Sequence, residues 1–197
     1  MSLQSLVQGY VVSALVGKIA TATGLPQSTV GSLASKALPL MLGGLATNAK
    51  KDDASADSLY TAIRDDHDGS IFDNLEGLIA NPQAAKGDKI LGHIFGQQTS
   101  AIETMLGKSV GVDTAQTKGV MEILAPLVMG ALGKQQTDKQ QSKAEVLQEL
   151  SDFSKESATM QDPEQNILMS LLDRDNDGSV LDDVMELGME FLKNRKA

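Results

Sequence analysis

The chain of 197 residues contains no cysteine and no tryptophan, and only two tyrosines and four phenylalanines. Without cysteine there can be no disulfide, no thiol catalysis and no thiolate metal site. With so few aromatic residues, the 41% of residues that are hydrophobic must build a mainly aliphatic core. Bases are scarce as well: 17 stand against 26 acids, and the formal net charge of −9 argues against a surface that follows nucleic-acid phosphates.

Long apolar runs and strand patterns are also missing. No stretch reaches the roughly 18 uninterrupted apolar residues of a membrane span, and the N-terminal stretch MSLQSLVQGYVVSALVGKIA lacks the basic start of a secretion signal. Sustained alternation of apolar and polar residues, which is typical of strands, does not occur. We therefore expect an all-α protein that lies in the cytoplasm and does not enter a membrane.

What the sequence does contain is helical periodicity. Apolar residues recur three and four positions apart from Leu3 to Ile19, which predicts one amphipathic helix that ends at Gly24. Pro39 and Pro126 lie inside later apolar runs. Because proline removes a backbone donor and clashes with the preceding turn, we expect each run to break or kink there and to continue as a short buried helix. Glycines in those runs would let neighbouring backbones approach closely.

The two halves of the chain follow one pattern. When Gly24 is aligned with Gly111, GLPQSTVGSLASKALPLMLGGL matches GVDTAQTKGVMEILAPLVMGAL without a gap, and the prolines coincide. The second half also has an insertion, which begins as a linker rich in Gln and Lys and ends in a helical pattern. We expect a multihelical array of two internally duplicated units, at 1–84 and 85–197, with a linker and a short surface helix near 134–165. The two units would pack as one domain.

Both halves carry an aspartate-rich phrase, RDDHDGSIFDN at 64–74 and DRDNDGSVLDD at 173–183. A calcium loop takes oxygen ligands at alternate positions and a glycine at the sixth, where the chain turns sharply. The second phrase fits this pattern up to its glycine. Val184 stands where a full-length loop closes with a carboxylate, but a shortened loop could close two residues earlier. The candidate calcium ligands are Asp173, Asp175, Asp177, Asp182 and the carbonyl of Ser179.

The first phrase is a weaker calcium candidate, because Arg64 replaces the leading acid. The acids that remain as candidate ligands are Asp66, Asp68 and Asp73. A second interpretation covers both phrases without metal: in Ser-Ile-Phe-Asp at 70–73 and Ser-Val-Leu-Asp at 179–182, a serine and an acid three residues later form a capping box at a helix start. The aspartate and glycine before each serine would make the preceding turn. Capping does not explain the two leading acids of the second phrase.

Other chemical signals are weak. His67 lies between two acids of the first phrase, and a lone imidazole there is more often solvated than bound to a metal. No phosphate loop, dinucleotide motif or nucleophile elbow occurs, so no catalytic or cofactor-binding residue is assigned. ATGLPQSTVGSLASKAL has the outline of a helix-turn-helix. Its second helix offers only Lys36 as a base, which is too little positive charge to hold DNA phosphates.

Several phrases together resemble a bacterial family. LPLMLGGLATNA, HDGSIFDNLEGLI, GDKILGHIFG, ILAPLVMGALGKQ and DRDNDGSVLDDVMELG are similar to the bacterial domain of unknown function numbered 937, and GVDTAQTKGVMEIL is also similar to the related YidB-like proteins. The resemblance extends from about Ser28 to Leu187. It implies a bundle of α-helices and a bacterial origin, and it supplies no activity and no catalytic residue.

These observations favour a non-enzymatic, acidic, helical protein that binds an unknown protein partner, or a second copy of itself, through helix faces. The alternative is a calcium-binding module that uses the second aspartate phrase. Binding of DNA through the helix-turn-helix outline is the least favoured of the three interpretations, because of the negative net charge.

Calcium binding by the second phrase can be tested directly. If the loop forms, calorimetric titration of the full chain with calcium should give heat, and the melting temperature should rise with calcium and fall with a chelator. Asp173→Ala should abolish both effects, because it removes the first ligand. Asp66→Ala, in the first phrase, is the matched control and should leave them unchanged. No heat at millimolar calcium, or an unaltered response in Asp173→Ala, would refute the site.

Overall fold

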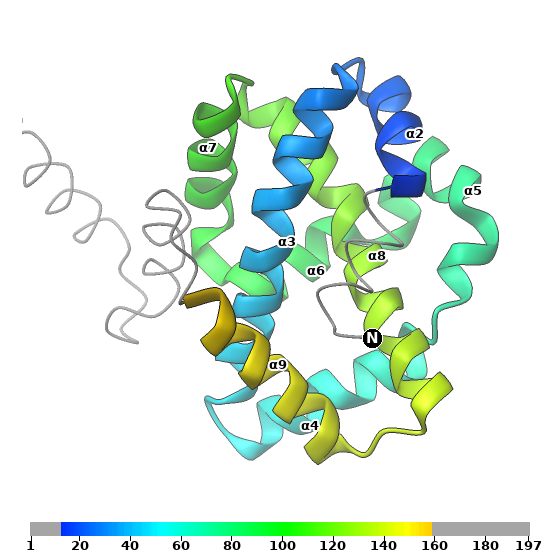
Figure 1. Ribbon diagram of the computed structural model, residues 1–197, viewed down its shortest axis with the longest axis vertical. Helices are drawn as coiled ribbons and strands as arrows, with labels where there is room; N and C mark the ends of the chain where they lie inside the picture. Colours follow the sequence, from blue (N-terminus) through cyan, green and yellow to red (C-terminus); the bar gives the residue numbers. More distant parts are fainter. Residues whose placement is uncertain (1–12, 159–197) are drawn as a thin grey trace, which may run out of the picture.

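The computed structural model describes residues 13–158, and all regular elements within that range are helices (Figure 1). This confirms the expected all-α fold class. The α-helices are α2 (Ser13–Thr23), α3 (Gln27–Ala49), α4 (Asp53–Thr61), α5 (Leu75–Ala80), α6 (Gly87–Phe95), α7 (Thr99–Val110), α8 (Thr114–Lys139) and α9 (Lys143–Ala158). The connections include a π-helical turn at Ala62–Asp66 and 3-10 turns at Ser70–Asn74, Pro82–Ala85 and Gly96–Gln98. None of these helices is long and apolar enough to cross a membrane.

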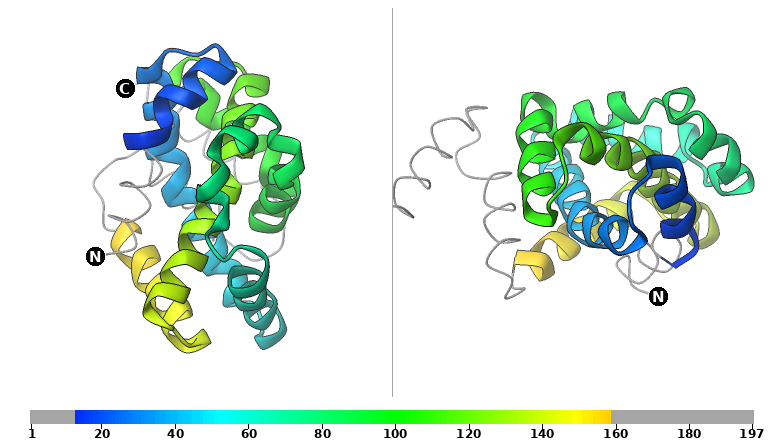
Figure 2. Two further views of the ribbon diagram at one scale, coloured as in Figure 1. Left: turned by 90° about the vertical axis from the view of Figure 1, so that its right-hand side faces the viewer. Right: turned by 90° about the horizontal axis from the view of Figure 1, so that it is seen from above.

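Helices α3 and α8 pack against each other in the centre of the molecule (Figure 1). Every residue from Ala37 to Ala46 in α3, and from Ile123 to Gly133 in α8, is buried. A helix that is apolar on all sides belongs in the interior, because each face needs another apolar surface to cover it. Helices α2, α6, α7 and α9 supply these surfaces and pack around the central pair (Figure 2).

The breaks expected at Pro39 and Pro126 are wrong, because both prolines lie inside continuous helices. Pro39 lies within α3 and Pro126 within α8, and both are buried. A proline inside a helix costs roughly 3 kcal/mol. Each fully buried apolar side chain contributes about 1.5–3 kcal/mol, and Leu38 and Leu40 on either side of Pro39 are 2% and 0% exposed. Burial of the surrounding residues therefore offsets the local penalty.

The segment expected as a linker near 134–165 is helical over most of its described part. Helix α8 continues to Lys139, so that only a short turn centred on Gln140 precedes α9. The helix expected after the linker is confirmed, but it is not a surface helix. Its residues Val146, Leu150 and Phe153 belong to the core, and α9 packs against α3 and α4.

Both central helices follow a left-handed glycine. Gly24 has φ 71° between α2 and α3, and Gly111 has φ 78° between α7 and α8. This confirms the predicted helix end at Gly24. The helix-turn-helix outline is thus found as α2 and α3, but its second helix supplies much of the core. The similar entry turns agree with a duplication of the two halves, which stays a prediction.

The role of α9 as a core helix can be checked by paired substitutions. Leu150→Ala should lower the free energy of unfolding by about 2–5 kcal/mol, because Leu150 is 0% exposed and its removal leaves a cavity. Leu147 is half-buried on the same helix, so Leu147→Ala should cost clearly less. Urea unfolding of both variants measures the difference. Equal and small losses would mean that α9 does not belong to the cooperative core.

Candidate functional site

The first aspartate phrase lies at the junction between α4 and α5, where the backbone geometry changes twice. Helix α4 runs directly into the π-helical turn Ala62–Asp66, and after His67 the chain enters the 3-10 turn Ser70–Asn74. π-Helical turns are rare and occur frequently at functional sites. Both turns pack on α8. The first aspartate phrase therefore lies at the edge of the molecule and packs on the central helix α8.

The charged groups of this phrase are largely paired with each other. The guanidinium of Arg64 donates from Nε and Nη2 to the two carboxylate oxygens of Asp65, at 2.5 and 2.6 Å, and this contact lowers the pKa of Asp65. Arg64 also lies over the ring of Tyr60, 5.7 Å from its centroid. The amide of Ser70 donates to Oδ1 of Asp68 at 2.9 Å, which lowers the pKa of Asp68. Two of the acids are thus committed to local contacts.

The first phrase does not assemble a metal-binding cluster. Within residues 13–158, no group of three or more His, Asp or Glu side chains is placed to hold a metal ion. The weaker of the two calcium candidates therefore has no support from the geometry. The stronger candidate, formed by Asp173, Asp175, Asp177, Ser179 and Asp182, lies outside the described residues. Its calcium binding stays a prediction.

The capping box predicted at 70–73 is wrong in its residues. The 3-10 turn follows Gly69, which has φ 96°, and no side chain caps it. The α-helix begins one turn later, where Oδ1 of Asn74 accepts a hydrogen bond from the amide of Gly77 at 3.0 Å and caps α5. The expected turn at Asp68 and Gly69 is confirmed. Because this turn leads into 3-10 geometry first, the capping role moves to Asn74.

Two glycines of α8 let the phrase lie directly on that helix. A Cβ at Gly133 would be 1.7 Å from the carbonyl oxygen of His67 and 2.6 Å from that of Ile63. A Cβ at Gly130 would be 2.5 Å from Cγ2 of Ile71. These distances admit no side chain, so the glycines set how closely the phrase approaches α8. The expected part of Gly130 in close packing is confirmed. Neither the part of Gly133 nor the segment that packs there was foreseen.

The contact with α8 also affects His67, which is half-buried. Burial lowers the pKa of His67, while the negative charges of Asp66 and Asp68 act in the opposite direction. Since burial is the larger effect, the imidazole is neutral at pH 7. His67 therefore contributes packing at this junction and no positive charge.

A second polar cluster, which we call the α9 junction, connects the end of α8 with α4 and α9. Its side chains come from Tyr60, Gln135, Gln136 and Glu149. The hydroxyl of Tyr60 and Nε2 of Gln136 both donate to the carbonyl of Gln141, at 3.0 and 2.9 Å. Nε2 of Gln135 donates to the carboxylate of Glu149. Gln135, Gln136 and Gln141 are all buried. Sequence reasoning missed them, because glutamines in a Lys-rich stretch resemble a solvated linker.

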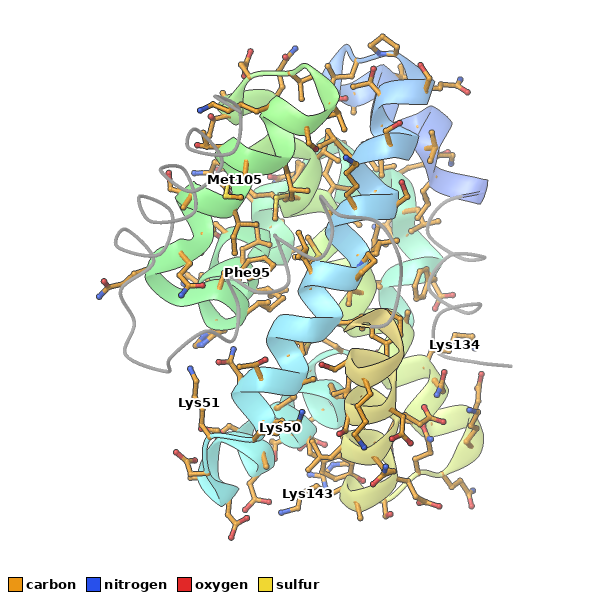
Figure 3. All side chains as sticks on the ribbon, turned by 60° about the vertical axis from the view of Figure 1, so that its left-hand side comes forward. Lys50, Lys51, Phe95, Met105, Lys134 and Lys143 are labelled. Atoms are coloured by element: carbon orange, nitrogen blue, oxygen red, sulfur yellow. The ribbon has the colours of Figure 1, made fainter. Side chains whose placement is uncertain are left out.

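Two exposed ion pairs flank the α9 junction. Nζ of Lys143, at the start of α9, lies 2.6 Å from Oδ1 of Asp57 on α4 (Figure 3), and this contact raises the pKa of Lys143. Nζ of Lys139 lies 3.1 Å from Oε1 of Glu149. Exposed pairs of this kind contribute about 0–1 kcal/mol each. They determine how α9 is oriented more than how strongly it is held.

Glu103 is a buried carboxyl elsewhere in the molecule. It lies on α7 and is 5% exposed. Burial raises the pKa of Glu103, Lys118 on α8 lowers it and Glu122 raises it further. Lys118 and Glu122 form a pair of their own at 3.6 Å. Glu103 is therefore a single buried carboxyl on α7 that faces α8. The nearby base, Lys118, is already paired with Glu122.

A groove with a volume of about 700 Å³ lies between α2 and α5. It is lined by Gly17, Lys18, Thr21, Ala22, Gln27, Glu76, Ile79 and Ala80. Nζ of Lys18 on α2 lies 3.1 Å from Oε1 of Glu76 on α5, so an ion pair joins the two walls. Small and apolar residues therefore share this groove with one charge of each sign.

These features define a class: an all-α domain with an aliphatic core around two central helices. Comparison with known families adds one match. The family model described as a bacterial protein of unknown function (DUF937) matches residues 5–135. The chain belongs to this family, which confirms the resemblance seen in its sequence. The likeness to YidB-like proteins stays a prediction. No curated protein and no solved structure matches the chain.

The close contact at Gly133 leads to a stability prediction. Gly133→Ala should lower the free energy of unfolding by about 1–3 kcal/mol or more, because the added methyl group overlaps a backbone carbonyl. Gly119→Ala, on the same helix but facing open space, is the control and should be neutral or stabilise by up to about 1 kcal/mol. Thermal unfolding of both variants compares them. If both alanines behave alike, the phrase does not rest on α8 at this distance.

Proposed function

We propose that the chain is a non-enzymatic interaction module that binds an amphipathic helix of a partner protein in the groove between α2 and α5. The supporting observation is the lining of that groove. Helical ligands bind to other proteins in grooves between helices, where residues on one face of the ligand contact the walls. The α2–α5 groove has two helical walls, and its volume of about 700 Å³ is open to solvent.

The small residues of the groove favour a helical ligand. Gly17 and Ala22 of α2 and Ala80 of α5 are among the residues that line the groove. Side chains of this size let the backbone of a ligand helix come close to both walls. Ile79, which is half-buried, adds apolar surface beside them. We therefore expect the ligand helix to present an apolar face with small residues among larger ones.

The ion pair across the groove favours a ligand with charges of both signs. Lys18 and Glu76 are 47% and 87% exposed at their side chains. An exposed pair contributes only about 0–1 kcal/mol, so a ligand can separate the two groups at little cost. An acid and a base at the edges of the ligand helix would then replace the lost contact. These charges would select the orientation of the ligand.

Calcium binding at 173–182 remains a separate proposal. It rests on Asp173 and Asp175, which a helix start does not require. The calcium proposal does not extend to the first aspartate phrase, because Arg64 replaces its leading acid and pairs with Asp65.

A photo-crosslinking residue in place of Thr21 tests the groove in living cells of the source bacterium. We expect it to link one partner through a segment that mass spectrometry identifies as an amphipathic helix. A synthetic peptide of that segment should then bind the purified chain. Ala22→Trp should weaken binding by about tenfold or more, which corresponds to 1.4 kcal/mol, because the indole fills the groove.

Ala115→Trp is the control for this experiment, because Ala115 is an exposed helical alanine outside the groove. It should leave peptide binding unchanged. Equal effects of the two tryptophans, or a linked segment that is not helical, would contradict the proposal. The same holds if Thr21 links no protein.

A further inference from the structure

Helix α9 already occupies a helix-binding face of this chain. Its buried residues Val146, Leu150 and Phe153 recur at helical spacing and pack on α3 and α4. Lys143 and Glu149 add directed contacts, to Asp57 on α4 and to Gln135 on α8. The α3–α4 face therefore recognises α9 by one apolar stripe and by charges at defined positions. Any copy of α9 that reaches this face would make the same contacts.

The connection between α8 and α9 is very short. Only residues 140–142 separate the two helices, and α9 packs on α3 and α4. Gln140 has φ 50°, a left-handed conformation that is unfavourable for a residue other than glycine. The turn is closed by the amide of Gln141, which donates to the carbonyl of Gln136 at 2.9 Å. A short connection with an unfavourable backbone conformation is a known setting for exchange of an element between copies.

The sequence around this turn favours a helix. Residues 134–158 contain four serines but no glycine and no proline, and Gln, Lys and Glu are frequent among them. These residues have high helix propensity, whereas helix ends normally carry glycine at the left-handed position. If Gln140 adopts the right-handed conformation, α8 and α9 can join into one helix. The left-handed Gln140 therefore has a helical alternative, which the capping contacts between Ser142 and Glu145 at the start of α9 oppose.

Tertiary contacts hold the turn closed. The carbonyl of Gln141 accepts hydrogen bonds from Tyr60 and from Gln136, whereas in a continuous helix it would accept one from the amide of Glu145. In a continuous helix, α9 would point away from its own α3. Its apolar stripe would then be exposed, and so would the α3–α4 face that it leaves. Two copies in this state can cover each other's exposed surfaces.

We propose that α9 is exchanged between two copies of this chain. In the dimer, α8 and α9 of each copy form one helix, and the α9 part docks on α3 and α4 of the other copy. The arrangement is reciprocal, as a two-fold symmetric dimer requires. This face is separate from the α2–α5 groove, so the exchange goes beyond the proposed function. The family match covers residues 5–135, so it includes α3 and α4 but not the exchanged helix α9.

Two substitutions at one position test the role of the turn. Gln140→Ala favours the continuous helix and disfavours the left-handed turn, whereas Gln140→Gly does the opposite. Gln140 is exposed, so neither change disturbs the core. After unfolding and refolding at high concentration, light scattering should show more dimer for Gln140→Ala than for the natural chain, and less for Gln140→Gly. Equal dimer fractions in the two variants, or no dimer in either, would overturn the proposal.

Crosslinking then identifies the exchanged helix. A carbodiimide joins a carboxylate to a nearby amine, and Lys143 and Asp57 are 2.6 Å apart. In a refolded mixture of Asp57→Asn chains and Lys143→Arg chains, neither chain can form this link within itself. Exchange of α9 brings Lys143 of one chain to Asp57 of the other. We expect a covalent dimer that contains this link, identified by mass spectrometry.

A dimer without the link between Lys143 and Asp57 would associate in another way, and the exchange of α9 would be refuted. The experiment is repeated with Ala22→Trp in both chains, which blocks the groove and leaves α9 untouched. The dimer should persist in that background. Loss of the dimer with Ala22→Trp would assign self-association to the groove instead. Failure of the exchange and failure of the groove are therefore separate results.

Discussion

The packing of α3 against α8 is the contact on which the other helices depend. Both helices are buried on every side over their middle turns, so neither could stand in water without the helices around it. Each surrounding helix in turn covers its apolar stripe by lying on this pair. The need to cover two fully apolar helices therefore explains why short elements such as α6 and α9 are helical and where they lie.

The same pair sets the positions of the polar features. Gly133 brings the backbone of His67 onto α8, and this close approach places the first aspartate phrase at the edge of the molecule. One turn further along α8, Gln135 and Gln136 reach α9 and the turn before it. The two polar regions thus contact neighbouring positions on the same central helix, α8. A change in the position of α8 would move both of them together.

Sequence predictions that depend on local interactions were correct, whereas features that depend on contacts between distant residues were predicted wrongly or missed. Helical spacing predicted the helix α9 correctly but not its burial, and the turn at Asp68 and Gly69 was also found as expected. Predictions at Pro39 and Pro126 were wrong, because the local cost of proline was weighed without the burial of its neighbours. In the candidate site, the acids were identified from the sequence. Their pairing with Arg64 and Ser70, and the contacts of Tyr60, could not be, because they depend on how α4, α8 and α9 meet.

The sequence by itself determined the helical class, the left-handed turn at Gly24 and the aliphatic nature of the core. These properties follow from periodicity, backbone preference and composition. The first two act between residues close in the chain, and composition depends on no contact at all. Only the tertiary structure decided that α8 runs on to Lys139, that its glutamines are buried and that α9 folds back. Burial depends on what lies opposite a residue, and for these residues the opposite surface comes from distant parts of the chain.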